Sequence, residues 1–124
     1  MSNATRLALS LCLSSVIASA GTFSGSLVDS KCFAAEERNV NPTDTQTSVD
    51  RDQNLEVRYC APRAKTKSFA VIAPDGTIYA LDAAGNLKAA ALVRNAGKKS
   101  RLAVAVNGEL NRNTIQVDSI SALR

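Results

Sequence analysis

The residues of this chain that could do chemistry are its cysteines, a short acidic series and two groups of basic side chains; the sequence contains no histidine. Because histidine is the usual general base near neutral pH and a common zinc ligand, its absence excludes mechanisms that depend on it. Cys60 could act as a nucleophile if Arg58 and Arg63 lowered the pKa of its thiol. No histidine can accept the thiol proton, however, and Cys32 is available for pairing. We therefore expect a non-catalytic protein; thiol or redox chemistry at Cys60 is the alternative.

One acidic series has the spacing of the first ligands of an EF-hand calcium loop: Asp50, Asp52, Asn54 and Glu56. That loop requires a glycine at its sixth position and a bidentate glutamate at its twelfth. Leu55 and Ala61 stand at those positions. We therefore expect no metal site and no cofactor here, and we interpret the series as the acidic first turn of a helix.

Residues 1–20 have the pattern of a secretory signal peptide. Arg6 supplies a positive charge, residues 7–19 are uncharged, and Ala18-Ser19-Ala20 has the small-x-small pattern that precedes a cleavage site. The alternative is a buried or interfacial N-terminal helix. Leu11 precedes Cys12 and apolar sequence continues beyond it, which argues against a lipoprotein. We expect a mature single domain of residues 21–124, secreted or periplasmic and without a membrane span.

The predicted mature chain keeps two cysteines, Cys32 and Cys60. An exported protein with an even number of cysteines most simply forms a disulfide. Two free thiols or a metal pair are the alternatives, but two isolated cysteines without CxxC spacing or histidine make a poor metal site. In the chain-entropy model, closing this loop would stabilise the fold by about 3–4 kcal/mol.

Alternating apolar residues predict five strands, at residues 22–29, 68–73, 77–82, 101–110 and 113–120. Pro74-Asp75-Gly76 and Asn111-Arg112-Asn113 are expected to be turns that join neighbouring strands. Gly25 and Gly108 are expected to mark a bend or a bulge within their strands.

Capping signals predict three helices. Ser30 can cap a helix that reaches about residue 38, Asp50 and Gln53 form a capping box for a second helix ending before Pro62, and Asn86 can cap a third over residues 87–95. Residues 39–48 are polar and are expected to form a loop.

Five strands with a helix between the third and fourth is the element order of an OB-like barrel. We therefore predict a mainly β (α+β) protein: an OB-like five-stranded barrel with a helical insertion between strands 1 and 2. An α+β sandwich with a similar element order is the alternative.

The basic residues are the strongest candidates for a ligand site. The chain has 15 Lys+Arg against 11 Asp+Glu. Two basic groups stand out: one follows the second predicted helix and consists of Arg58, Arg63, Lys65 and Lys67, and the other surrounds the start of the fourth predicted strand and consists of Arg94, Lys98, Lys99 and Arg101. OB-folds commonly bind oligonucleotides or oligosaccharides across strands 2 and 3, where Tyr79 is a potential stacking platform, with Tyr59 as another. The candidate ligand-binding residues are Arg63, Lys65, Lys67, Tyr79, Lys98, Lys99 and Arg101.

The partner expected for these residues is an anionic polymer, a small ligand or an envelope protein. Export and the scarcity of aromatic residues argue against nucleic acid. The alternative is that the charge only keeps the protein soluble.

Three stretches resemble a family of small exported bacterial proteins of unknown function, abundant in acidobacteria. They are Gly25-Ser26-Leu27-Val28-Asp29-Ser30-Lys31-Cys32, the hairpin of residues 69–81, and residues 96–120. The family often has a Cys-x-x-x-Cys pair on its middle helix and a histidine after the first cysteine; here Glu56 precedes Cys60 in that spacing and no histidine exists. The resemblance implies export and an OB-like barrel, and it implies no activity.

Overall fold

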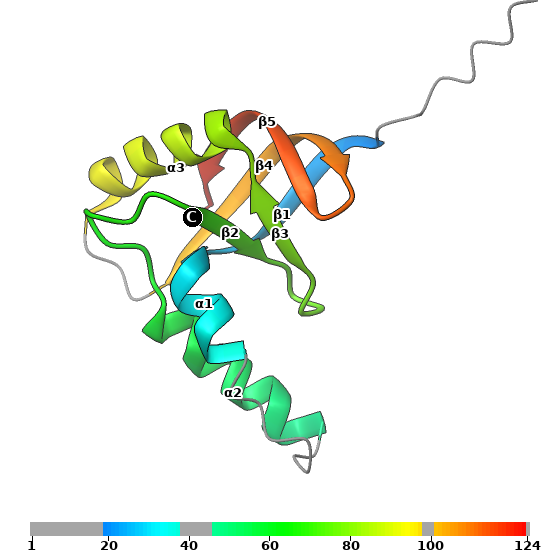
Figure 1. Ribbon diagram of the computed structural model, residues 1–124, viewed down its shortest axis with the longest axis vertical. Helices are drawn as coiled ribbons and strands as arrows, with labels where there is room; N and C mark the ends of the chain where they lie inside the picture. Colours follow the sequence, from blue (N-terminus) through cyan, green and yellow to red (C-terminus); the bar gives the residue numbers. More distant parts are fainter. Residues whose placement is uncertain (1–18, 38–45, 98–100, 124) are drawn as a thin grey trace, which may run out of the picture.

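The computed structural model describes residues 19–37, 46–97 and 101–123 (Figure 1). In chain order the elements are β1 (Ser19–Asp29), α1 (Ser30–Glu37), α2 (Gln46–Tyr59), β2 (Phe69–Ile72), β3 (Ile78–Leu81), α3 (Ala83–Ala96), β4 (Leu102–Asn111) and β5 (Thr114–Ala122). The five predicted strands and three predicted helices are therefore all present. No helix in these described ranges has the length and apolar character needed to cross a bilayer.

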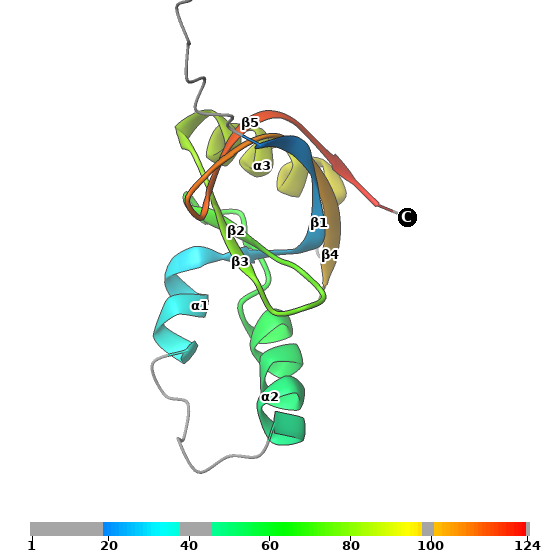
Figure 2. The same cartoon turned by 90° about the vertical axis from the view of Figure 1, so that its right-hand side faces the viewer.

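The strands form a closed barrel in the order β1-β2-β3-β5-β4. Strand β1 is antiparallel to both β2 and β4, and β3 is parallel to β5. This is the predicted OB-like barrel, with α1 and α2 inserted between β1 and β2. Figures 1 and 2 show α1 and α2 side by side beyond one end of the barrel and α3 across the other.

Two glycines let the long strands follow the curvature of the barrel. A Cβ atom at Gly25 would lie 2.2 Å from the carbonyl oxygen of Ile72, and one at Gly108 would lie 2.1 Å from that of Gln116. The β4–β5 register also shifts between Asn107 and Gly108. The predicted bend and bulge are thus places where backbones approach too closely for any side chain.

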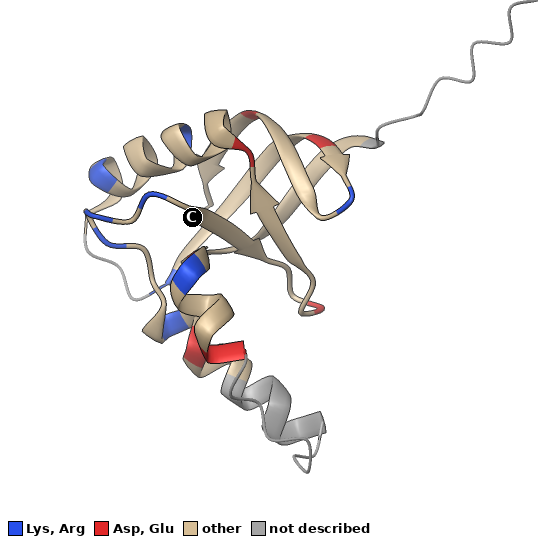
Figure 3. Cartoon of the chain, viewed as in Figure 1, with Lys and Arg blue, Asp and Glu red and all other residues tan. Residues whose placement is uncertain are grey.

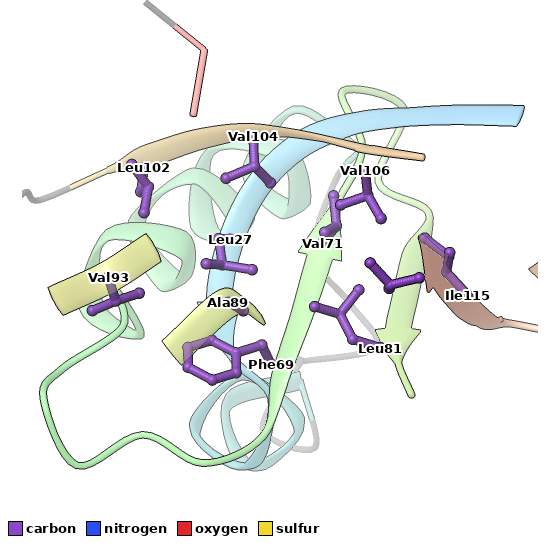
Figure 4. Packing of buried hydrophobic residues seen from close by; sticks show 11 residues of the cluster. Leu27, Phe69, Val71, Leu81, Ala89, Val93, Leu102, Val104, Val106 and Ile115 are labelled. Carbon is purple, nitrogen blue, oxygen red and sulfur yellow. The ribbon is translucent and has the colours of Figure 1, made fainter. Parts of the chain in front are cut away.

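The main core fills the barrel and extends to α3. The apolar residues that alternate along β4 point inward, as predicted: Leu102, Val104 and Val106 are 5%, 0% and 0% exposed. Figure 4 shows them converging with Leu27, Phe69 and residues of α3. The buried members of this cluster are Leu27, Phe69, Val71, Leu81, Ala89, Val93, Leu102, Val104, Val106, Ile115 and Val117.

A second, smaller core lies on the outer side of β1 and β2. Because successive residues of a strand point to opposite faces, Phe69 and Val71 enter the barrel while Ala70 and Ile72 point away from it. The outward side chains pack under the helical insertion. The buried members of this second core are Val28, Phe33, Val57, Cys60, Ala70 and Ile72.

Two helices begin at a different cap from the one predicted. Asp29, not Ser30, caps α1, because its Oδ1 accepts hydrogen bonds from the backbone nitrogens of Lys31 and Cys32 at 3.0 and 3.1 Å. The side chain of Ser30 instead hydrogen-bonds the hydroxyl of Ser68 at 2.5 Å.

Helix α3 begins before the predicted Asn86. Its cap is Asp82, whose carboxylate accepts from Gly85 N at 2.8 Å. Asn86 lies within the helix, and its Oδ1 accepts a hydrogen bond from Phe69 N at 2.9 Å. Its side chain therefore ties the start of β2 to α3 instead of capping a helix.

Helix α2 begins at Gln46, four residues before the predicted capping box at Asp50. The predicted loop of residues 39–48 accordingly ends within α2, and residues 39–45 lie outside the described residues. The EF-hand-like series from Asp50 to Glu56 lies wholly on this helix. The interpretation of Asp50 and Asp52 as a first helical turn is therefore wrong.

A candidate anion-binding groove

A groove of about 880 Å³ lies beside the barrel, between the end of α2 with the coil that follows it and the end of α3. We call it the cationic groove. It is lined by Arg58, Tyr59, Ala61, Pro62, Arg63, Ala64, Lys65, Val93, Arg94 and Gly97.

Four of the lining side chains are cations: Arg58, Arg63, Lys65 and Arg94. All four are exposed, and the groove lining contains no acidic residue. Within the part of the chain that the structure describes, none of the four forms an ion pair. In Figure 3 Lys and Arg gather on the left of the view, where α3 ends and the coil between α2 and β2 runs. The groove therefore offers four positive charges that form no ion pair with a carboxylate of the described residues.

The rest of the lining is mostly carbon. Val93, 9% exposed, is shared with the main core, and Ala61 and Pro62 are half-buried. Tyr59 is 67% exposed, which leaves most of its ring uncovered. The groove thus combines an apolar base with a cationic edge.

A turn fixes the coil that carries Arg63 and Lys65. Arg63 N donates to Thr66 Oγ1 at 3.0 Å, and Thr66 N donates back to the carbonyl oxygen of Arg63 at 3.0 Å. Thr66 is 8% exposed, and its hydroxyl also donates to Asp29 Oδ2 at 3.0 Å. The base of the turn is therefore anchored to the end of β1, while its basic side chains face solvent.

The predicted disulfide between Cys32 and Cys60 is present and anchors the other end of the same coil. Its Cα atoms are 5.5 Å apart, and Cys60 is 1% exposed. The carbonyl oxygen of Cys60 also accepts a hydrogen bond from Asp29 N at 2.8 Å. A smaller cavity of about 240 Å³ beside the disulfide shares Tyr59, Ala61 and Arg63 with the cationic groove.

The structure brings only some of the candidate residues together. Arg63 and Lys65 line the cationic groove, joined by Arg58 and Arg94 from the same two basic groups of the sequence. Lys67 is exposed on the same coil but does not line the groove. Lys98 and Lys99 lie outside the described residues.

Tyr79 and Arg101 lie elsewhere. The ring of Tyr79 is half-buried and packs against Phe23, with ring centroids 5.1 Å apart. Arg101 lines a separate cavity of about 460 Å³, where its Nε donates to Ser26 Oγ at 3.0 Å. Neither residue contributes to the cationic groove.

The outer face of β2 is covered by the protein's own helices. Ala70 and Ile72, its outward residues, are 2% and 5% exposed beneath α1 and α2. The strand face that OB-folds commonly use for binding is thus filled at this strand. The open basic surface lies instead at the cationic groove.

Sequence reasoning did not find Val93 or Pro62 as part of a site. Apolar residues in a helix or before a turn carry no signal of their own, because the same types fill ordinary cores. The usable signal was the run from Arg58 to Lys67, which contains four basic residues and no acidic one.

Comparison with protein-family models, with curated proteins and with solved structures finds no match to this chain. The resemblance to small exported bacterial domains therefore stays a prediction.

Proposed function

We propose that this protein is an exported, non-catalytic module that binds an anionic ligand in the cationic groove. The observation that carries the proposal is the convergence of Arg58, Arg63, Lys65 and Arg94 around one concave surface. Like charges that line one groove repel one another, so four cations in a lining that contains no carboxylate favour an anion that neutralises them.

The alternative function, thiol or redox chemistry at Cys60, has less support. Cys60 is buried and bonded to Cys32, and it packs in the second core with Phe33 and Val57. A reactive thiol is commonly accessible and deprotonated near a cation. These surroundings favour a structural bond that holds the coil of the groove.

Binding is tested by titrating the purified protein with heparin and with single-stranded DNA at low and moderate salt. The groove variant is Arg63→Ala/Lys65→Ala. The matched control is Lys88→Ala/Arg112→Asn, which removes two exposed cations outside the groove; Asn suits position 112 because Arg112 has a φ of 60°.

We expect the groove variant to lose affinity for the polyanion by about tenfold or more, and its salt dependence to become shallower because fewer counterions are released. The control should bind within about twofold of the parent protein. If the parent protein binds neither of these polyanions nor a small organic anion at low salt, the proposal is overturned. Equal losses in both variants would overturn it too, because net charge alone would then explain the binding.

A further inference from the structure

The groove lining has an unusual chemical composition. Among the described residues that line it there is no Asp, Glu, Asn, Gln, Ser or Thr. Arg and Lys side chains only donate hydrogen bonds, so the Tyr59 hydroxyl is the one lining side chain that can also accept. A sugar polymer or a nucleic-acid base presents donors as well as acceptors, and its donors would find almost no side-chain partner here.

The same lining suits a ligand with two unlike parts. The half-buried Ala61 and Pro62, with the uncovered ring of Tyr59, offer carbon surface from which water is released when an apolar group covers it. Arg63 and Arg94 offer planar guanidinium groups that pair with a carboxylate or phosphate through two hydrogen bonds. A volume of about 880 Å³ lies within the range of pockets that hold small molecules.

We propose that the ligand is a monomeric anionic amphiphile: an alkyl chain that ends in a carboxylate or a phosphate. The anionic end lies among Arg58, Arg63, Lys65 and Arg94, and the chain lies over Pro62 and the ring of Tyr59. This inference rests on the proposed function, since it names the class of anion that the cationic groove takes. A free fatty acid and a single-chain phosphate lipid are two sources of this chemistry.

The charge of the groove selects the end of the amphiphile that binds. An alkyl ammonium of the same length offers the same carbon surface but is repelled by the four cations. An alkyl alcohol has no charge for the guanidinium groups to pair with. Affinity should therefore require the anion and the chain together, whereas a polar polyanion would require the charge alone.

The test is calorimetric titration of the whole protein with sodium alkanoates and with monoalkyl phosphates of six, eight and ten carbons, each below its critical micelle concentration. Alcohols and trimethylammonium salts of the same chain lengths are the controls. We expect the dissociation constant to fall by up to about fourfold for each CH₂ that becomes buried. The carboxylate and phosphate series distinguish the two sources by which binds more tightly at equal length.

Ala64→Glu is the variant that probes the site, because Ala64 is exposed and lines the groove. We expect the added carboxylate to weaken binding at every chain length by about tenfold or more. Ala84→Glu, on an exposed position in the first turn of α3, is the matched control and should bind as the parent does. Tyr59→Ala should reduce the gain per CH₂ while leaving the preference for an anionic end.

Four results would overturn the inference. Dissociation constants that do not change with chain length would exclude the amphiphile but leave the proposed function standing. So would a failure of both the alkanoates and the alkyl phosphates to bind, if heparin still distinguishes the Arg63→Ala/Lys65→Ala variant from its control. If the protein bound anionic phospholipid vesicles but no monomeric amphiphile, the ligand of the groove would be a membrane surface instead. If neither heparin nor any alkyl anion binds, the proposed function fails as well.

Discussion

The carboxylate of Asp29 joins the start of α1 to the coil that forms the cationic groove. Its Oδ1 accepts from two backbone nitrogens of α1, and its Oδ2 accepts from the hydroxyl of Thr66. The Thr66 hydroxyl in turn accepts from Arg63 N. One side chain therefore caps a helix and fixes the turn that carries two of the four groove cations.

Replacement of Asp29 by Ala should lower the free energy of unfolding by about 1–3 kcal/mol. The loss combines the missing helix cap with the buried Thr66 hydroxyl, which would lack an acceptor. Urea denaturation measures the difference. Asp118→Ala, at an exposed position on β5, should stay within about 0.5 kcal/mol of the parent protein. Equal stability of the two variants would contradict the role of Asp29.

The carboxylate of Asp75, in the β2–β3 turn, also accepts a hydrogen bond from a nearby backbone nitrogen. Its Oδ1 accepts from Thr77 N at 3.0 Å. This backbone hydrogen bond, with a second from the Thr77 side chain, favours the charged carboxylate and lowers the pKa of Asp75 below its ordinary value of 3.8.

The stabilisation from Asp75 should depend on pH in one direction only. Because its pKa is lower in the folded than in the unfolded state, the contribution is complete above the unfolded pKa and is lost as the pH falls through the folded pKa. NMR titration of the Asp75 carboxyl carbon should give a midpoint below 3.8. Asp75→Asn should flatten the acid limb of the stability curve. A midpoint at or above 3.8 would contradict this account.

Strand β1 pairs with both β4 and β2 because it bends. Its first nine residues, Ser19–Leu27, pair with β4, while Ser26–Asp29 pair with β2. Gly25 lies where the strand passes from one partner to the other, against the backbone of Ile72. The absence of a side chain there allows the sheet to close.

Gly25→Ala should therefore destabilise the protein by about 1–3 kcal/mol, because the new Cβ would collide with backbone that cannot move like a flexible side chain. Gly21→Ala is the control on the same strand: its Cβ would meet only the ring of Phe23, at 3.9 Å. Thermal unfolding of both variants compares them directly. A Gly25→Ala variant as stable as Gly21→Ala would show that β1 closes the barrel in another way.

The barrel and the helical insertion have separate cores, and strands β1 and β2 contribute side chains to both of them. The second core has few large side chains, and the disulfide lies within it. A covalent bond restricts the unfolded chain most where the closed loop is long, and here it spans 28 positions of the sequence. The insertion, and with it the coil of the groove, thus depends on the bond more than the barrel does.

Reduction of the disulfide, or the double variant Cys32→Ala/Cys60→Ala, should lower the free energy of unfolding by about 3–4 kcal/mol. Anion binding should weaken in parallel, because the coil that starts at Cys60 would lose one anchor. Urea denaturation with and without a thiol reductant measures the first effect, and heparin titration the second. Non-reducing peptide mapping should find Cys32 and Cys60 cross-linked. Two alkylatable thiols in the native protein would favour the redox alternative.

Cleavage of the proposed signal peptide predicts where the mature chain begins. At the N-terminal end of β1, Ser19 pairs with Leu110 and Ala20 pairs with Glu109. Cleavage after Ala20 would therefore remove these two of the nine β1–β4 residue pairs and keep the other seven. We expect intact-mass measurement of the exported protein to give Gly21 as the N-terminus. A stable periplasmic form that begins at Met1 would argue against a cleaved leader.

Features that depend only on neighbouring residues could be predicted from the sequence. Alternation at Leu102, Val104 and Val106 predicted the buried face of β4, because side chains of a strand alternate regardless of what lies opposite. Pro74-Asp75-Gly76 predicted the β2–β3 turn, where Gly76 has a φ of 89°. The pairing of the two cysteines followed from their number and the predicted compartment.

Which hydrogen-bond partner each polar side chain takes depends on contacts between residues far apart in the sequence. The sequence predicted Ser30 as the cap of α1 and Asn86 as the cap of α3, whereas Asp29 and Asp82, of a residue type that also caps helices, take those places. Groups far away in the sequence engage the predicted caps: the side chain of Ser30 is hydrogen-bonded to the hydroxyl of Ser68, and that of Asn86 accepts a hydrogen bond from the backbone nitrogen of Phe69. Helix signals are local, but competition for a hydrogen bond is not.

The cationic groove is likewise a product of packing. Arg63 and Arg94 belong to different basic groups of the sequence, and nothing in their spacing says that they share a surface. They meet because α3 packs on the barrel through Ala89 and Val93, while the disulfide and Asp29 hold the coil after α2 beside the end of that helix. The sequence determined that the chain carries excess positive charge; where that charge is concentrated was decided by the hydrophobic burial that places α3 and by the bonds that fix the coil.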